Sequence, residues 1–323
     1  MNRVLLRAQS GSRAGAGHEM RTRAVAEEVD ARGGAALLLV DDEESAVRLR
    51  RAGFEAACVL ARPSWALEPA AGAWIDGFRS DWSDDVRRLA RRRTPSYLVE
   101  NRTRAREWAS FVVQPNLHAD RDAWERVHAA RVLCGPRWIP LRREVRAVHA
   151  SERRDVDLLV SFGGSDPLRS TERVLAALPR GTRVAVSVGA HMHARRTEIE
   201  RAARHLAADV LADSAALAPW MARARLAITA LGTTLYELAH LRTPALILAN
   251  YDADRPVLEW YRGAGPFRPL GLARELDDAA LRGALAAALA QEFVLAPRIP
   301  ELGEGAANLA ERLLGREHAA LAA

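Results

Sequence analysis

The sequence predicts an α/β protein of two domains, each built around a parallel β-sheet. Short apolar runs alternate with stretches of helical periodicity along the whole chain, which is typical of strand–helix–strand units. The chain of 323 residues is also long enough for two hydrophobic cores. The alternation stops at residues 135–140, and a charged stretch follows up to Arg154. We therefore expect an N-terminal domain over residues 1–138 and a C-terminal domain over residues 139–323 that ends in a helix.

The expected elements follow from the period of the apolar residues. In the N-terminal half, apolar runs predict strands at Val4–Ala8, Ala36–Val40, Ala57–Leu60, Ala73–Asp76, Tyr97–Val99, Phe111–Gln114 and Val132–Cys134, with helices at Gly17–Arg32, Glu43–Ala52 and Ser83–Arg93. In the C-terminal half, strands are expected at Asp157–Phe162, Arg183–Val188, Val210–Ala212, Leu226–Thr229 and Ala245–Leu248, with helices at Ser170–Leu178, Arg195–Leu206, Ala215–Ala222, Thr233–His240, Arg255–Arg262, Asp277–Gln291 and Gly305–Leu314. Each half opens with a strand that runs into a glycine-rich turn.

Composition narrows the class of protein. The 47 basic residues are all arginine and give a formal net charge of +6, but they are interleaved with acids, so a nucleic-acid surface is not expected. The N-terminus has no signal-peptide hydrophobic region, and the apolar runs are too short to span a membrane. Cys58 and Cys134 lie in strand-like apolar runs and are expected to be buried thiols. We expect a cytoplasmic protein.

The turn after the first strand is the candidate reaction site. Gly15 and Gly17 frame a loop whose backbone N–H groups can approach a ligand, and His18 stands at the start of the helix. Open α/β sheets bind ligands at the carboxyl ends of their strands. A histidine ring, with an ordinary pKa of about 6.5, is largely neutral at cytoplasmic pH and suits a general base.

The same turn has a dinucleotide-binding alternative. Gly15-Ala16-Gly17 begins the G-x-G-x-x-G pattern, and Asp41 ends the next strand, where a ribose-binding acid would stand. However, Met20 occupies the position of the third glycine, and the loop is longer than a nucleotide-binding turn usually is. We therefore favour the first interpretation.

The first glycine-bearing turn of the C-terminal half is a candidate phosphate site. Gly163 and Gly164 follow a strand and precede a helix, so their N–H groups could meet phosphate oxygens. The alternative is a tight turn in which Asp166 caps the helix. A glycine pair by itself leaves both interpretations open.

A second turn of this layout carries a stronger signal. Gly232, Thr233 and Thr234 follow a strand and open a helix, where their donors could meet a diphosphate. Glu237 lies about one turn further along the same face, and its carboxylate could accept both ribose hydroxyls of a nucleotide. The alternative is a capping box between Thr234 and Glu237, and both roles can hold together.

Two further strand ends carry polar residues, Asp76 and Asn250, which either face a sugar or belong to ordinary polar loops. The spacing of His191 and His193 resembles that of two metal ligands, but no cysteine or carboxylate lies at a spacing that would complete a metal site. We therefore expect an exposed loop there and no metal.

Together these segments resemble the UDP-sugar hydrolases of pseudaminic acid biosynthesis and the related spore-coat polysaccharide proteins. Those are two-domain proteins of GT-B type, similar to the glycosyltransferase that builds lipid II. The matching pieces stand in family order and span about Arg3 to Gly271: residues 7–21 with their Gly-x-Gly-His, 163–166, 232–238 and 247–250. Gln9, Phe78 and Tyr251 depart from the family pattern on the sugar side, so the identity of the sugar stays open.

The resemblance implies two Rossmann-like domains with an interdomain cleft. Because no set of residues has the spacing of metal ligands, and helix starts can supply positive potential, we expect a reaction that needs no cofactor or metal. The resemblance also implies that His18 is the catalytic base, that Gly232 to Thr234 meet the diphosphate, and that Glu237 meets the ribose. The remaining expected substrate contacts are Gly15, Gly17, Arg21, Asp76, Gly163, Gly164 and Asn250. The implied reaction is hydrolysis of a UDP-activated amino or deoxy sugar at its anomeric carbon, by a monomer or weak dimer. The alternatives are a GT-B glycosyltransferase with a UDP-sugar donor and a catalytically silent nucleotide-sugar-binding protein.

Overall fold

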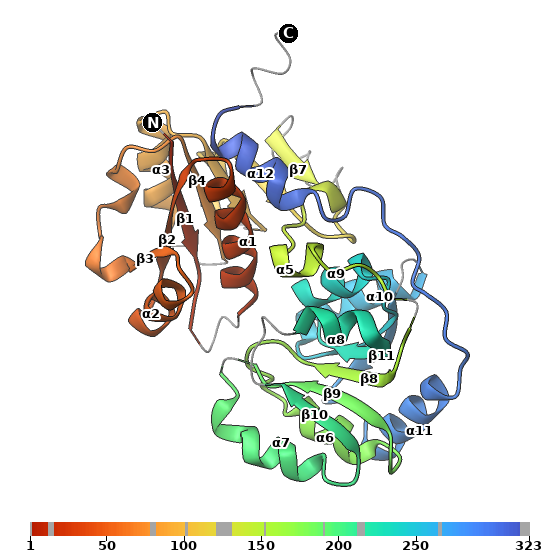
Figure 1. Ribbon diagram of the computed structural model, residues 1–323. Coiled ribbons are helices and arrows are strands. Elements are labelled where there is room, and N and C mark those ends of the chain that lie inside the picture. Colours follow the sequence, from red (N-terminus) through yellow and green to blue (C-terminus); the bar gives the residue numbers. More distant parts are fainter. Residues whose placement is uncertain are drawn as a thin grey trace. The chain divides into compact units, whose positions relative to one another are not determined.

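The computed structural model describes residues 2–11, 16–77, 82–100, 103–120, 131–151, 153–189, 191–211, 217–263 and 267–316. The chain forms two compact units (Figure 1). Unit 1 takes in residues 1–14, 18–143 and 300–323, and unit 2 takes in residues 15–17 and 144–299. Each unit is built on its own parallel sheet.

Unit 1 contains a sheet with the strand order β3-β2-β1-β4-β5-β6-β7 among the described residues. Its strands are β1 (Arg3–Ala8), β2 (Ala35–Val40), β3 (Glu55–Cys58), β4 (Gly72–Asp76), β5 (Ser96–Val99), β6 (Phe111–Gln114) and β7 (Val132–Cys134). All their pairings are parallel. The order reverses beside β1, whose neighbours are β2 and β4, so the loops after β1 and β4 flank a topological switch point.

Helices cover both faces of this sheet. The α-helices of unit 1 are α1 (Gly17–Ala31), α2 (Glu43–Arg51), α3 (Ser83–Arg91) and α12 (Gly305–Leu313), and α5 (Arg143–Arg146) follows at its boundary. Short 3₁₀ turns are η1 (Val59–Ala61), η2 (Trp65–Leu67), η4 (Arg104–Glu107) and η6 (Pro136–Trp138). Val25 of α1 and Leu309 of α12 share one apolar cluster, whereas Leu89 of α3 packs in another with Trp65. Cys58 and Cys134 are buried thiols that are not joined in a disulfide, as expected.

The last helix belongs to unit 1, whereas the sequence analysis placed it in the C-terminal domain. Leu309 and Leu313 are fully buried in the cluster that holds Trp74 of β4. A Cβ at Gly72 would lie 2.7 Å from the Leu313 carbonyl oxygen, so the glycine permits the close packing of α12 on β4. The amphipathic pattern predicts this helix but does not say which sheet its apolar face covers.

Unit 2 contains a second parallel sheet, with the order β10-β9-β8-β11-β12-β13 among the described residues. Its strands are β8 (Val156–Ser161), β9 (Arg183–Ser187), β10 (Ala207–Leu211), β11 (Ala224–Thr229), β12 (Ala245–Ala249) and β13 (Phe267–Leu272). Strand β13 was not predicted from the sequence, because Pro269 and Gly271 interrupt its apolar run. Such residues are tolerated at a sheet edge, where β13 lies.

The helices of unit 2 are α6 (Ser170–Ala177), α7 (Arg196–Ala202), α8 (Leu217–Arg223), α9 (Thr233–His240), α10 (Arg255–Gly263) and α11 (Asp278–Leu289), with 3₁₀ turns η7 (His193–Arg195) and η9 (Asp252–Asp254). Val174 of α6 and Leu281 of α11 pack in the main apolar cluster of this unit. None of the helices in the described part of the chain has the length and apolar character needed to cross a membrane. The expected cytoplasmic location and the expected monomer or weak dimer stay predictions.

Candidate active site

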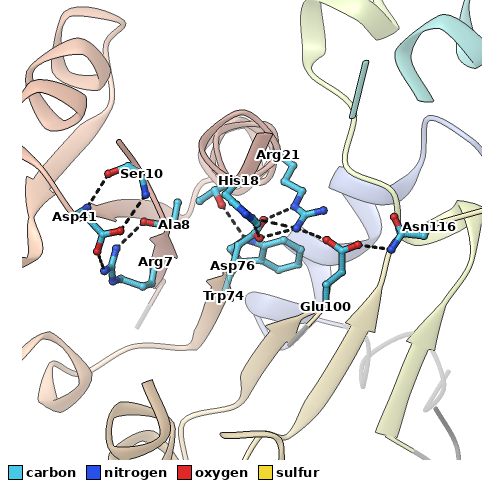
Figure 2. Close-up of polar contacts among 11 residues, drawn as sticks. Arg7, Ala8, Ser10, His18, Arg21, Asp41, Trp74, Asp76, Glu100 and Asn116 are labelled. Atoms are coloured by element: carbon cyan, nitrogen blue, oxygen red, sulfur yellow. Dashed lines mark hydrogen bonds and ion pairs between the residues drawn. The ribbon is translucent and has the colours of Figure 1, made fainter. Parts of the chain in front are cut away.

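His18 lies at the switch point of the unit 1 sheet, beside a buried carboxylate (Figure 2). The ring is on the first turn of α1, and Asp76 is the last residue of β4, where it pairs in register with Ala8 of β1. His18 Nδ1 is 2.7 Å from Asp76 Oδ1. His18 is 8% exposed and Asp76 is 0% exposed, so the carboxylate approaches the ring from the inside of the protein.

This contact selects one tautomer of the ring. A carboxylate accepts hydrogen bonds, so Nδ1 of His18 carries the proton and donates it to Asp76. The lone pair of the neutral ring is then on Nε2. An imidazole oriented in this way by a carboxylate can act as a general base through Nε2.

Arg21, one turn further along α1, fixes the other side of Asp76. Its Nε is 2.5 Å from Asp76 Oδ2, and its Nη2 is 2.8 Å from Asp76 Oδ1. Burial alone would raise the pKa of the Asp76 carboxyl, but Arg21 and His18 outweigh that effect and hold the pKa below its ordinary value. Burial likewise acts to lower the pKa of Arg21, yet Asp76 and Glu100 raise it. Asp76 and Arg21 are therefore both charged.

The site continues to Glu100 and Asn116, which the sequence analysis did not single out. Arg21 Nη2 is 2.5 Å from Glu100 Oε2, and the Asn116 side-chain amide donates to Glu100 Oε1. Glu100 directly follows β5, and Asn116 stands two residues after β6. Polar residues just past strand ends are the available sequence signal, because parallel strands place their carboxyl ends along one edge.

Asp76 and Arg21, which are both expected to contact the substrate, are buried: Asp76 is 0% exposed and Arg21 is 7% exposed. Their contact with the substrate stays a prediction. Their described contacts are directed at His18, at Glu100 and at each other. They support the ring of His18 from behind. Gly15 and Phe78 lie outside the described residues.

Both carboxylate oxygens of Asp41 make contacts within unit 1, so this side chain is not available to bind the ribose of a dinucleotide. Its Oδ1 pairs with the buried Arg7 guanidinium, and its Oδ2 accepts from the Ser10 backbone N–H at 3.0 Å (Figure 2). The Ser10 hydroxyl also donates to Asp42 Oδ2 at 2.5 Å. These bonds secure the loop that leaves β1, which disfavours the dinucleotide interpretation.

In unit 2, the candidate phosphate turns follow neighbouring strands of the sheet. Gly163 and Gly164 follow β8, and Gly232 follows β11, which pairs with β8. Gly163 has a φ of 75°, which favours glycine. Asp166 accepts from the backbone N–H groups of Ser170 at 2.8 Å and Thr171 at 3.0 Å. The capping role of Asp166 is confirmed, and phosphate binding by the glycine pair stays a prediction.

Helix α9 starts two residues earlier than a Thr234–Glu237 capping box requires. Gly232 is its N-cap and Thr233 its first residue, so the third helical residue is Leu235 rather than Glu237. The capping-box interpretation is therefore wrong. Glu237 lies one turn inside the helix and is 5% exposed. Gly232 is exposed and Thr233 and Thr234 are half-buried, so the amino end of α9 is accessible.

The strand after α9 ends at a third candidate. Asn250 follows β12, and its side-chain oxygen is buried without a hydrogen-bond partner in the described structure. A buried acceptor left unfilled costs about 1–3 kcal/mol, which a ligand donor would recover. Tyr251 beside it is 56% exposed.

Among the described residues, no group of three or more histidine, cysteine or acidic side chains is placed to hold a metal ion. The absence of a metal at the loop with His191 and His193 stays a prediction. The His191 backbone N–H donates to the Gly164 carbonyl at 2.9 Å, so this loop supports the turn after β8.

A cavity of about 500 Å³ opens elsewhere in unit 2. It is lined by Asp157, Thr182 and Arg225 at the amino ends of the strands, together with apolar residues of the segment after α11. This is the opposite edge of the sheet from the three candidate turns. The chemistry therefore points to the carboxyl edge and not to this cavity.

Gly232→Ala tests whether a ligand approaches the amino end of α9. A Cβ at Gly232 would meet no atom within 4 Å among the described residues, so the fold does not require the glycine. We expect unchanged stability and an increase of about tenfold in the Kd for UDP, or about 1.4 kcal/mol, measured by calorimetric titration. Gly283→Ala, on the exposed side of α11, is the matched control and should leave the Kd unchanged. Equal Kd values for Gly232→Ala and wild type would remove this turn from the nucleotide site.

Neither a family model nor a curated protein sequence matches this chain. Solved structures do match over nearly the whole length. MurG from Acinetobacter baumannii is 13% identical with a TM-score of 0.62, covering 98% of this chain and 99% of that chain. A putative UDP-N-acetylglucosamine 2-epimerase from Listeria monocytogenes is 12% identical with a TM-score of 0.61, covering 99% and 97%. UGT89C1 from Arabidopsis thaliana, complexed with UDP, is 14% identical with a TM-score of 0.59, covering 97% and 95%. The chain therefore has a GT-B-type α/β fold with two Rossmann-like domains, as the sequence analysis expected.

Proposed function

We propose that this protein hydrolyses a UDP-sugar at its anomeric carbon, with His18 as the general base. The observation that carries the proposal is the 2.7 Å contact between His18 Nδ1 and the buried, ionised Asp76. It leaves the ring lone pair on Nε2, where it can accept a proton from water. The His18 position also matches the catalytic histidine of the family that the sequence resembles.

In the proposed step, the oxygen of a water molecule forms a bond to the anomeric carbon while Nε2 of His18 takes a proton from that water. The bond between that carbon and the diphosphate oxygen breaks, and its electron pair leaves with UDP. The N–H groups at the amino end of α9 would stabilise the charge that develops on UDP. The products are UDP and the free sugar.

Three observations support a nucleotide site in unit 2. The amino end of α9 is accessible, Glu237 lies one turn inside the helix and is 5% exposed, and the Asn250 side-chain oxygen is a buried acceptor without a hydrogen-bond partner among the described residues. These residues lie in the segments that follow β11 and β12, which are adjacent strands of the sheet. A related fold holds UDP in the Arabidopsis complex.

The test is UDP release from a panel of UDP-sugars, followed by NMR, first without an acceptor and then with added acceptor sugars. Release in water alone supports the hydrolase. Release that requires an acceptor identifies a glycosyltransferase in which His18 deprotonates an acceptor hydroxyl. Binding of UDP-sugars without turnover identifies a silent binding protein, and either of these outcomes overturns hydrolysis.

Glu237→Gln tests the ribose contact. If Glu237 accepts ribose hydroxyls, the variant should bind UDP more weakly by about 1.5–3 kcal/mol, the usual worth of a hydrogen bond to a charged group. Its affinity for 2′,3′-dideoxy-UDP should equal that of wild type, because that ligand has no hydroxyls to lose. Calorimetric titration of both proteins with both ligands makes the comparison.

Glu259→Gln, on the exposed surface of α10, is the matched control for the charge change. A purely structural Glu237 predicts another pattern: a lower melting temperature and equal changes in affinity for the two ligands. That pattern would take the ribose role away from Glu237.

A further inference from the structure

Behind His18, two carboxylates from different strand ends hold a single buried guanidinium. Arg21 contacts Asp76 through Nε and Nη2, and its Nη2 also lies 2.5 Å from Glu100 Oε2. The Asn116 amide fixes the other oxygen of Glu100. Figure 2 shows His18, Asp76, Arg21, Glu100 and Asn116 as one continuous row of polar contacts.

The backbone at Glu100 is set for this contact. Val99, the last residue of β5, packs in the apolar cluster that includes α1, so a further extended residue would point to the opposite face of the sheet. Glu100 instead has a φ of 48°, in the left-handed region that non-glycine residues seldom occupy. This turn brings its carboxylate to Arg21. Strained residues of this kind persist where the surroundings impose them, and they gather at functional sites.

The net charge of this row of side chains is zero only when the His18 ring is protonated. With a neutral His18, the two carboxylates and Arg21 sum to −1, and with a protonated His18 they sum to zero. An uncompensated charge is costly inside a protein. His118, after β6, also faces Glu100, but burial lowers the pKa of its ring although Glu100 opposes this, so it stays neutral at neutral pH.

We propose that Glu100 is a positioning residue that offsets the charge of Arg21, so that the His18–Asp76 pair can accept a proton. The inference rests on the proposed function, in which His18 takes a proton from water. Arg21 orients Asp76 through two hydrogen bonds, but its positive charge, 3.3 Å from His18 Nδ1, opposes protonation of the ring. The negative charge of Glu100 offsets this effect of the Arg21 charge, while the two hydrogen bonds from Arg21 still orient Asp76.

The test is a cycle of three variants that changes the charge of the row in both directions. Glu100→Gln brings the net charge of the row to zero when the His18 ring is neutral. The loss of activity in acid should therefore occur at a pH about one unit lower than in wild type. We also expect kcat to fall several-fold and KM to stay unchanged. Arg21→Gln brings the net charge to −2, and the acidic limb should move to higher pH. The double variant restores −1, and its limb should return to the wild-type position. Replacing both members of a buried ion pair is often well tolerated, so the double variant keeps the test open if a single variant does not fold.

Glu28→Gln is the matched control, because Glu28 is a buried glutamate of unit 1 that also pairs with an arginine, Arg32. It should lower stability but leave the acidic limb in place. The inference is overturned if the folded Glu100→Gln variant keeps the wild-type limb, or if the double variant, when it alone folds, differs from wild type.

A second readout separates this inference from the proposed function. ¹⁵N NMR of the His18 ring follows its protonation with pH whether or not any UDP-sugar turns over. Midpoints that move as the charge cycle requires, in a protein that releases no UDP, would sustain the inference and overturn hydrolysis. Turnover of a UDP-sugar together with midpoints that do not move would sustain hydrolysis and overturn the inference.

Discussion

Replacing His18 by Asn is expected to lower the rate of UDP release by about a hundredfold to ten-thousandfold, the usual cost of losing a positioned general base. Affinity for UDP should stay close to that of wild type, because the candidate nucleotide residues Gly232, Glu237 and Asn250 belong to unit 2 and His18 belongs to unit 1. Asn keeps a polar group that can donate to Asp76, so the fold should be retained. Initial rates and calorimetric titration with UDP make the measurement.

His193→Asn is the matched control, since His193 is an exposed histidine of unit 2. Its turnover should equal that of wild type. Turnover of the His18 variant near the wild-type rate would remove His18 from the mechanism. An equal loss of UDP binding would show instead that His18 holds the phosphates.

Asp76→Asn is expected to lower kcat by about a thousandfold while changing KM little, because an amide can present an N–H to Nδ1 and favour the other tautomer. In that tautomer Nε2 carries the proton and is no longer a base. The variant also leaves Arg21 with one carboxylate in place of two, so we expect a loss of about 3 kcal/mol in the free energy of unfolding. Kinetics, chemical denaturation and ¹⁵N NMR of the ring measure the three effects.

The stability effect also has a defined pH dependence. The pKa of Asp76 is lowered in the folded protein, so its contribution is fully present above the unfolded pKa of about 3.9 and is lost as the pH falls through the folded value. The difference in stability between wild type and Asp76→Asn should therefore be constant near neutral pH and shrink in acid.

Asp42→Ala is the control for a lost carboxylate in unit 1. Asp42 caps α2 by accepting from the Ser45 N–H at 2.8 Å, so its loss should cost about 1 kcal/mol of stability without changing the His18 tautomer. If Asp76→Asn keeps the wild-type ¹⁵N pattern and the wild-type kcat, then Asp76 does not orient the ring.

Much of the fold was determined by the sequence alone, because strands and helices depend on local periodicity. The run at Val4 to Leu6 is buried as β1, and the helix expected at Thr233–His240 begins and ends at those residues. His18 was found through its glycine-rich turn, which is also a local signal. The resemblance added the GT-B fold class, which the comparisons with solved structures support.

The tertiary structure decided what depends on contacts between distant residues. The order β1-β4-β5-β6 places the ends of these strands along one edge, and so joins His18 to Asp76, 58 residues away, and Arg21 to Glu100. Likewise, the apolar face of α12 specifies burial but not a partner, so only packing assigned the helix to unit 1. Periodicity determines which residues are buried, whereas the order of the strands determines which buried residues meet.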